Sequence, residues 1–181
     1  MSTRTAANSG ISVLFVCTGN ICRSPLAEGV LRSFVTSAGL QDRVRIDSAA
    51  THDYQLGQPP DPRAVAAARR RGYLLAPRHA RTVGSEDFAC FDIILAMDRG
   101  HLTILRELKP LDYRGYLGLL LDFAPGLPVR EVPDPYHDTA EQFEYVLDLI
   151  ERGDEGLFET IREGIAANRA PLLPERELRR L

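Results

Sequence analysis

A thiol and a guanidinium lie close together in the segment Cys17-Thr-Gly-Asn-Ile-Cys-Arg23, which follows an apolar run and precedes Ser24-Pro25. The Ser-Pro pair is typical of a helix start. A loop between a strand and a helix points backbone N–H groups inward and adds the positive end of the helix dipole, which suits an anion such as phosphate. Gly19 and Asn20 tolerate the positive φ angles that such a loop needs. The segment is therefore predicted to bind an oxyanion.

Cys17, at the start of this loop, is the predicted nucleophile. A helix N-terminus and a neighbouring cation favour the thiolate, the reactive form of cysteine. Arg23 can bind two phosphoryl oxygens at once and balance the charge that they carry in the transition state. The Ser24 hydroxyl can either donate to the thiolate or cap the helix. A bare Cys-x5-Arg spacing arises by chance in about one in three chains of this composition, so its strand, Gly-Asn and Ser-Pro context carries the prediction.

A proton donor for the leaving group is expected at Asp134. An aryl phosphate leaves as a phenolate, whose conjugate acid has a pKa of about 10, so the reaction needs a general acid. Asp134 stands between Pro133 and Pro135 in Val-Pro-Asp-Pro-Tyr-His-Asp. The two prolines restrict the backbone on both sides of the carboxyl group. The alternative is an ordinary Pro-Asp turn, which composition alone favours.

The elements that must position these groups alternate between strand and helix. Continuous apolar runs predict buried strands at 11–16, 44–48, 91–97 and 115–121. Caps and apolar spacing predict helices from Ser24-Pro25 to before Gly39, from Asp61-Pro62 to Arg71, from Asp98 to about Lys109, and from Thr139 to about Asn168, with potential breaks at Gly153 and Gly156. This alternation predicts one doubly wound α/β domain with a parallel sheet, which binds ligands beyond the carboxyl ends of its strands.

Composition narrows the class of protein. The chain has 181 residues, 44% of them apolar, which is enough for a sizeable core. No apolar run reaches the roughly 18 residues of a membrane span, and a net charge of −3 offers no basic face for nucleic acid.

Three cysteines and no export leader favour reduced thiols in the cytoplasm. The Cys and His spacing matches no metal site, so no metal and no other cofactor is expected. Residues 1–9 and 169–181 are expected to be loosely ordered flanks of a domain at 10–168.

The two chemical segments together resemble a known family. Val16-Cys-Thr-Gly-Asn-Ile-Cys-Arg-Ser-Pro25 and Asp134-Pro-Tyr136 are similar to the motifs of the low-molecular-weight protein tyrosine phosphatases. The likeness covers roughly residues 11–168, including Asp47-Ser-Ala49 and the Ile94 to Asp98 segment. The resemblance implies a four-stranded parallel sheet with helices on both faces and a flavodoxin-like winding. It also implies metal-independent hydrolysis of phosphotyrosine on proteins through a cysteinyl-phosphate intermediate.

Carried over by position, the resemblance assigns Cys17 as nucleophile, Arg23 as phosphate clamp, and Asp134 as general acid and then base. Asn20 and Ser48 would hold the loop and Ser24 the thiolate. The remaining residues of the phosphate-binding loop would be Thr18, Gly19, Ile21 and Cys22. Cys22 also matches a second loop cysteine that can form a reversible disulfide with Cys17. The pocket walls would include Tyr54, Tyr136 and His137, for which plain packing is the alternative.

Three other hypotheses assign a function to the same loop. A thiol-based arsenate reductase needs a further cysteine near the end of the third strand, where this chain has Leu95-Ala-Met97, whereas Cys90 precedes the strand. A phosphate-carrying or phosphoprotein-binding module would lack the acid that Asp134 provides. A branch acting on phosphoarginine fits less well, because Ile21 is bulky and apolar. The expected partners are therefore a tyrosine-phosphorylated protein and inorganic phosphate or other oxyanions, bound by a monomer.

Overall fold

The sheet in this computed structural model has four parallel strands in the order β2-β1-β3-β4. The structure describes residues 10–171, 173 and 174. The expected N-terminal flank at 1–9 lies outside that range, as do residues 172 and 175–181 of the expected C-terminal flank. The strands are β1 (Ile11–Cys17), β2 (Val44–Ala50), β3 (Ile93–Ala96) and β4 (Tyr116–Leu119).

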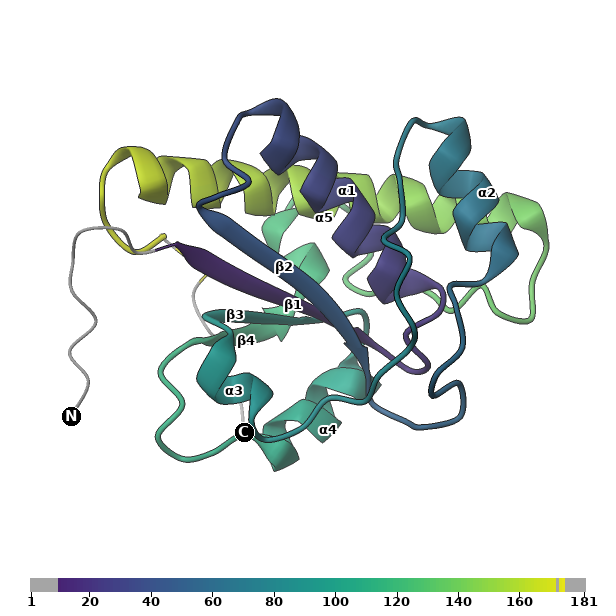
Figure 1. Cartoon of the computed structure of the whole chain (residues 1–181), viewed down its shortest axis with the longest axis horizontal. Coiled ribbons are helices and arrows are strands. Elements are labelled where there is room, and N and C mark those ends of the chain that lie inside the picture. The colour runs from purple at the N-terminus through teal and green to yellow at the C-terminus, as the bar shows by residue number, and fades with distance from the viewer. Residues whose placement is uncertain (1–9, 172, 175–181) are drawn as a thin grey trace.

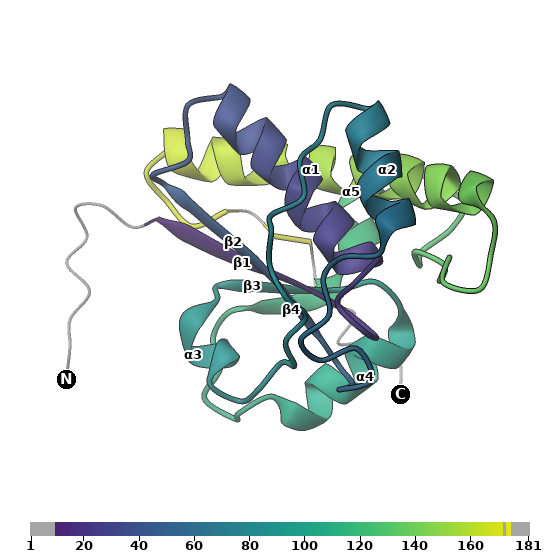
Figure 2. The same ribbon diagram turned by 45° about the vertical axis from the view of Figure 1, so that its right-hand side comes forward.

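Helices cover both faces of the sheet, as predicted (Figures 1 and 2). One face carries α1 (Arg23–Ser37), α2 (Pro62–Arg70) and α5 (Ala140–Ala166), and the other carries α3 (Asp87–Cys90) and α4 (Arg99–Leu108). Strand β1 lies between two neighbours and between both layers, so all seven of its residues are buried. Val13 and Phe15 pack into the core under α1 and α5, whereas Leu14 and Val16 pack into the second core. The predicted fold class is confirmed.

The N-termini of the helices near the carboxyl ends of the strands fix the directions of several polar side chains. Asp61 caps α2 by accepting from Arg63 N at 2.8 Å, and Asp98 caps α4 by accepting from His101 N at 3.0 Å, as predicted. The predicted start of α1 at Ser24-Pro25 is wrong. The helix begins at Arg23, because the Cys22 carbonyl already accepts the first turn's bond from Leu26 N. The Ser24 hydroxyl makes no capping bond and is free for another role.

The last helix has nearly the expected bounds, but it lacks the breaks that its glycines suggested. Neither Gly153 nor Gly156 breaks α5, which is continuous over Ala140–Ala166. The two glycines allow the 3-10 turn η1 (Leu120–Phe123), which follows β4, to approach the helix closely. A Cβ atom at Gly156 would collide with the carbonyl oxygen of Phe123. The close approach anchors the start of residues 124–139, the acid loop, which carries Asp134.

The described residues contain no helix long and apolar enough to cross a membrane.

Helix α5 carries one buried carboxyl group. Asp154 is fully buried, and in the part of the chain that the structure describes neither of its carboxylate oxygens has a hydrogen-bond partner. Burial raises the pKa of this carboxyl group well above its usual value, because the charged form loses its hydration.

We expect Asp154→Asn to raise the free energy of unfolding more at pH 7 than at pH 4. An unfolded Asp ionises above about pH 4, whereas the buried carboxyl group stays protonated to higher pH. The folded state therefore binds the extra proton, and wild-type stability falls as pH rises through that window. Urea unfolding at both pH values measures the difference. The exposed variant Asp112→Asn is the control, and an equal gain for Asp154→Asn at both pH values would contradict the prediction.

Candidate active site

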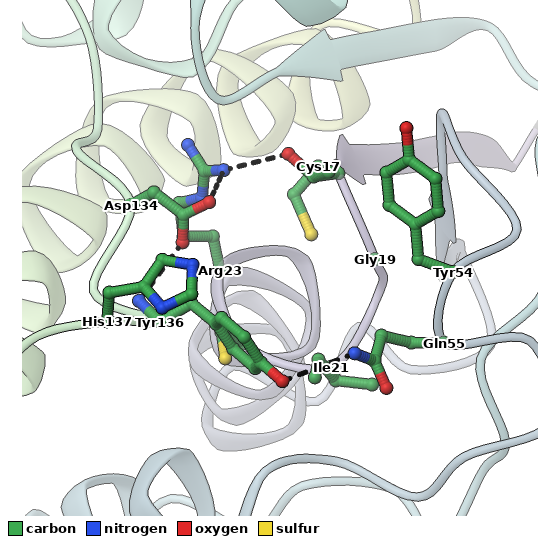
Figure 3. A pocket seen from close by; sticks show the side chains of 11 residues that line it. Cys17, Gly19, Ile21, Arg23, Tyr54, Gln55, Asp134, Tyr136 and His137 are labelled. Carbon is green, nitrogen blue, oxygen red and sulfur yellow. Dashed lines mark hydrogen bonds and ion pairs between the residues drawn. The ribbon is translucent and has the colours of Figure 1, made fainter.

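A cavity of about 260 Å³ lies at the carboxyl end of β1 (Figure 3). It brings together Cys17, Arg23 and Asp134, although Arg23 and Asp134 are 111 positions apart in the sequence. The other predicted site residues that line it are Thr18, Gly19, Ile21, Cys22, Tyr54, Tyr136 and His137, and Gln55 joins them. Three further predicted residues, Asn20, Ser24 and Ser48, are buried behind the loop and do not line the cavity.

The loop is held from behind by the side chain of Asn20. This residue has φ 57°, in the left-handed region that asparagine tolerates. Its Nδ2 atom donates to Ser24 Oγ at 3.0 Å and to Ser48 Oγ at 2.9 Å, and its Oδ1 atom accepts from Arg81 N at 3.2 Å. One amide therefore ties the loop to the start of α1, to β2 and to the segment at Arg81.

The Cys17 sulfur lies 3.0 Å from Ser24 Oγ. Because Ser24 Oγ already accepts from Asn20, its own hydrogen is left for the sulfur or for the carbonyl oxygen of Ala49, which is farther away at 3.4 Å. A sulfur that receives this hydrogen is stabilised as a thiolate. The N-terminus of α1 begins in the same loop and adds its positive dipole end.

A buried carboxylate ends this chain of hydrogen bonds. Glu28 is 3% exposed and accepts from Ser48 Oγ at 2.7 Å and from Arg32 Nη2 at 2.7 Å. The connection therefore runs from Cys17 through Ser24, Asn20 and Ser48 to a paired charge. Sequence reasoning missed Glu28. The available signal was the i, i+4 spacing of Glu28 and Arg32 on one face of the helix.

Arg23 is 2% exposed, so its charge needs partners inside the protein. Its Nη1 atom donates to Asp98 Oδ2 at 2.9 Å and to Val132 O at 3.1 Å. Its Nη2 atom donates to Asp134 Oδ2 at 2.8 Å and to Thr18 Oγ1 at 3.2 Å. The guanidinium thus links the loop to β3–α4 and to the acid loop.

Asp98 was expected only as a helix cap, but it also pairs with Arg23. Burial would raise the pKa of this carboxyl group, yet the hydrogen bonds from His101 and the Arg23 charge outweigh burial and hold the pKa well below its usual value. Asp98 is therefore ionised across the physiological range and can neutralise the buried guanidinium.

The acid loop is fastened to α2 by Arg63. This guanidinium pairs with Asp61 at 2.8 Å and donates to the backbone oxygens of Tyr136 at 2.9 Å and Asp138 at 3.2 Å. Asp134 Oδ1 in turn accepts from Tyr136 N at 3.2 Å, while its side chain remains 48% exposed. The carboxyl group is therefore fixed in place and still accessible to a substrate.

Aromatic side chains stand on two sides of the cavity. In Figure 3, Arg23 and Asp134 lie on one side of the Cys17 sulfur and Tyr54 lies on the other. Tyr54 is 72% exposed and stacks on His52 with ring centroids 4.9 Å apart. Across the cavity, Tyr136 accepts from Gln55 Nε2 at 3.3 Å. Such walls suit a flat aryl group.

The three cysteines occupy different surroundings. The Cys22 thiol lines the cavity, and burial together with the Asp61 carboxylate raises its pKa, so it stays protonated. Cys90 is exposed at the end of α3, before β3 begins. The cavity lies at the other end of the sheet, where β3 ends at Ala96 without a cysteine. The disulfide relay of the arsenate reductase alternative therefore has no third thiol here.

The chain is similar to proteins of known sequence and structure. The model of the family described as "Low molecular weight phosphotyrosine protein phosphatase" matches residues 12–167. The Sus scrofa protein of that name is 40% identical over 153 residues, which cover 83% of this chain and 96% of that protein. A crystal structure of an Entamoeba histolytica protein tyrosine phosphatase, with Hepes in its active site, has a TM-score of 0.82 at 36% identity and covers 86% of this chain and 99% of that one. A Drosophila arginine phosphatase has a TM-score of 0.76 at 28% identity and covers 81% of this chain and 95% of that one.

Proposed function

The chain belongs to the low molecular weight phosphotyrosine protein phosphatase family, and on that premise we propose how its own residues divide the reaction. The family uses a cysteine-based mechanism to hydrolyse phosphotyrosine on proteins. The observation that carries the assignment is the meeting of a thiol, a buried guanidinium and an accessible carboxyl group in one cavity. The catalytic set that we propose is Cys17, Arg23 and Asp134.

In the first step, the Cys17 thiolate attacks phosphorus, the sulfur–phosphorus bond forms and the bond to the tyrosine oxygen breaks. Asp134 gives its proton to the departing phenolate. Arg23 and the backbone N–H groups of the loop bind the phosphoryl oxygens, whose charge is spread in the transition state. The incoming dianion binds the N–H groups of Arg23 that contact Asp134 in the free protein.

In the second step, the Asp134 carboxylate takes a proton from water, and the water oxygen attacks phosphorus. The sulfur–phosphorus bond breaks and inorganic phosphate is released, which restores the thiolate. The Ser24 hydroxyl, 3.0 Å from the sulfur, stabilises the leaving thiolate in this step and the attacking thiolate in the first. Asn20 and Ser48 position Ser24, since Asn20 donates to both hydroxyl groups.

The cavity walls support an aromatic substrate. Tyr54, Tyr136 and Ile21 all line the cavity. We propose that a phosphotyrosine ring lies between these side chains with its phosphate on the loop, and that His137 contacts it from the acid loop. The other oxyanion expected in the loop is the product, inorganic phosphate.

We also propose that the phosphatase domain spans residues 10–168 and acts as a monomer in the cytoplasm. The match of the family model to 12–167 supports the boundaries. The proposed catalytic set is complete within one chain, so the reaction needs no residue from a second copy. A reducing compartment is favoured because the mechanism needs Cys17 as a free thiol.

Cys17→Ser should abolish hydrolysis of nitrophenyl phosphate while binding of inorganic phosphate or vanadate persists. A serine hydroxyl at neutral pH lacks the nucleophilicity of a thiolate, whereas the loop and Arg23 remain. Release of nitrophenol, measured with a metal chelator present, checks this. The matched control is Cys90→Ser, whose exposed thiol lies away from the cavity and should leave the rate unchanged. Turnover by Cys17→Ser at the wild-type rate would overturn the nucleophile assignment.

Asp134→Asn should slow turnover about 10²- to 10⁴-fold on phenyl phosphate and much less on nitrophenyl phosphate. A poor leaving group needs the proton from Asp134, whereas nitrophenolate leaves without it. Steady-state kcat/KM on the two esters measures the ratio, because it includes only the steps up to cleavage of the ester bond and not the second step that both esters share. Asp138→Asn, in the same loop, is the control, because only its backbone oxygen contacts Arg63. Equal losses on the two esters would remove the general acid role.

Reversible oxidation is proposed for the Cys17 and Cys22 pair. Hydrogen peroxide would convert the Cys17 thiolate to a sulfenic acid, and the Cys22 thiol would then form a disulfide with release of water. Wild type treated with peroxide should regain its activity when dithiothreitol is added. The Cys22→Ser variant should lose activity progressively, because its Cys17 is oxidised irreversibly. Activity recovered after a fixed peroxide dose is the measurement. Equal recovery of the two proteins would refute the disulfide.

A further inference from the structure

His101 is a buried histidine on α4 that the mechanism above does not use. It is 4% exposed and lies behind the phosphate-binding loop. Its Nε2 atom is 2.8 Å from Thr18 Oγ1, and its Nδ1 atom is 3.0 Å from Asp98 Oδ1. Thr18 and Asp98 are also the partners of Arg23, at 3.2 Å on Nη2 and 2.9 Å on Nη1. Guanidinium, carboxylate, imidazole and hydroxyl therefore form a closed ring of four side chains.

The ring has one self-consistent arrangement of protons when the imidazole is neutral. Thr18 Oγ1 accepts from Arg23, so its own hydrogen can go to His101 Nε2. An Nε2 atom that accepts leaves the ring proton on Nδ1, which faces the Asp98 carboxylate. Each member then lies within 3.2 Å of its neighbour, with directed hydrogen bonds on the Arg23 and Thr18 sides and a close Nδ1–Oδ1 approach of 3.0 Å, without hydrogen-bond geometry, at Asp98.

We propose that His101 is a positioning residue for Arg23. It bridges the loop after β1, through Thr18, to the junction of β3 and α4, through Asp98. These are the two segments that hold the clamp from its buried side. The imidazole sets their separation, and that separation aims the Arg23 N–H groups at the phosphoryl oxygens. The proposal rests on the clamp role of Arg23 proposed above.

Packing alone does not explain His101. The apolar contacts of α4 with the sheet come from Leu102 and Leu105, which belong to the second core. Both ring nitrogens of His101 face partners of a single guanidinium. A displacement of about 1 Å in a group that orients substrate can cost about 100-fold in rate, so a change in this bridge should be visible in kcat.

The test compares three substitutions of His101 with nitrophenyl phosphate as substrate. His101→Leu keeps the bulk and removes both polar contacts, and we expect kcat to fall about 10- to 100-fold with KM changed less than about threefold. His101→Gln places an amide near the position of Nε2 and should recover most of the loss. His101→Asn reaches only toward Asp98 and should recover less. If all three variants keep the wild-type kcat, or if His101→Gln and His101→Asn are as slow as His101→Leu, the proposal fails.

A double-mutant cycle tests the route through Thr18. Thr18→Val removes the hydroxyl group that both His101 and Arg23 contact. If His101 acts through it, the double variant Thr18→Val/His101→Leu should have nearly the kcat of the slower single variant. Losses that simply multiply would show that His101 acts independently of the ring.

Two further variants separate this proposal from its alternatives. Leu102→Val loosens the same helix without touching the ring, and it should lower stability to urea while kcat stays within about twofold of wild type. An equal fall in kcat at equal stability loss would make His101 merely structural. Arg23→Lys tests the clamp itself. If Arg23→Lys lowers kcat but His101→Leu keeps the wild-type kcat, only the positioning role of His101 is overturned. If Arg23→Lys itself keeps the wild-type kcat, the proposed function is overturned.

Discussion

A buried positive charge organises the carboxyl end of the sheet. The Arg23 guanidinium is almost without solvent, so each of its N–H groups needs an acceptor from the protein. The acceptors come from three separate segments, the loop after β1, the start of α4 and the acid loop. Neutralising this one charge therefore requires the same convergence of segments that assembles the candidate active site.

The nucleophile lies beside a second polar system that is built in a different way. On this side the hydrogen bonds are between neutral groups, from Asn20 to the hydroxyls of Ser24 and Ser48, and only at Glu28 do they reach a charge. Arg32 pairs with that carboxylate, so the chain ends at a balanced ion pair. Neutral donors stabilise a thiolate without placing a competing cation in contact with the sulfur. The cation that meets the substrate is kept to the other side of the cavity, at Arg23.

The backbone around the site is held by close packing as well as by polar contacts. Gly153 and Gly156 let η1 approach α5, because any Cβ atom there would collide with Leu120 or Phe123. The acid loop leaves from this packed turn, and its far side is fastened by Arg63 to the start of α2. Asp134 thus sits on an irregular segment whose two ends are fixed. That explains how an exposed carboxyl group keeps a defined position over a buried thiol.

The amino-acid sequence by itself determined the local chemistry. The order of strand, Gly-Asn loop and helix around Cys17, the Pro-Asp-Pro segment at 134, and the alternation that predicts a parallel α/β sheet are all properties of short stretches, where neighbouring residues decide the backbone. The helix caps at Asp61 and Asp98 could be predicted from the sequence for the same reason. Only the tertiary structure decided which distant groups meet. Glu28 and His101 lie behind the site, Ser24 contacts the sulfur and does not cap the helix, and α5 continues through Gly153 and Gly156. All three outcomes depend on contacts between distant segments, which local sequence patterns do not encode.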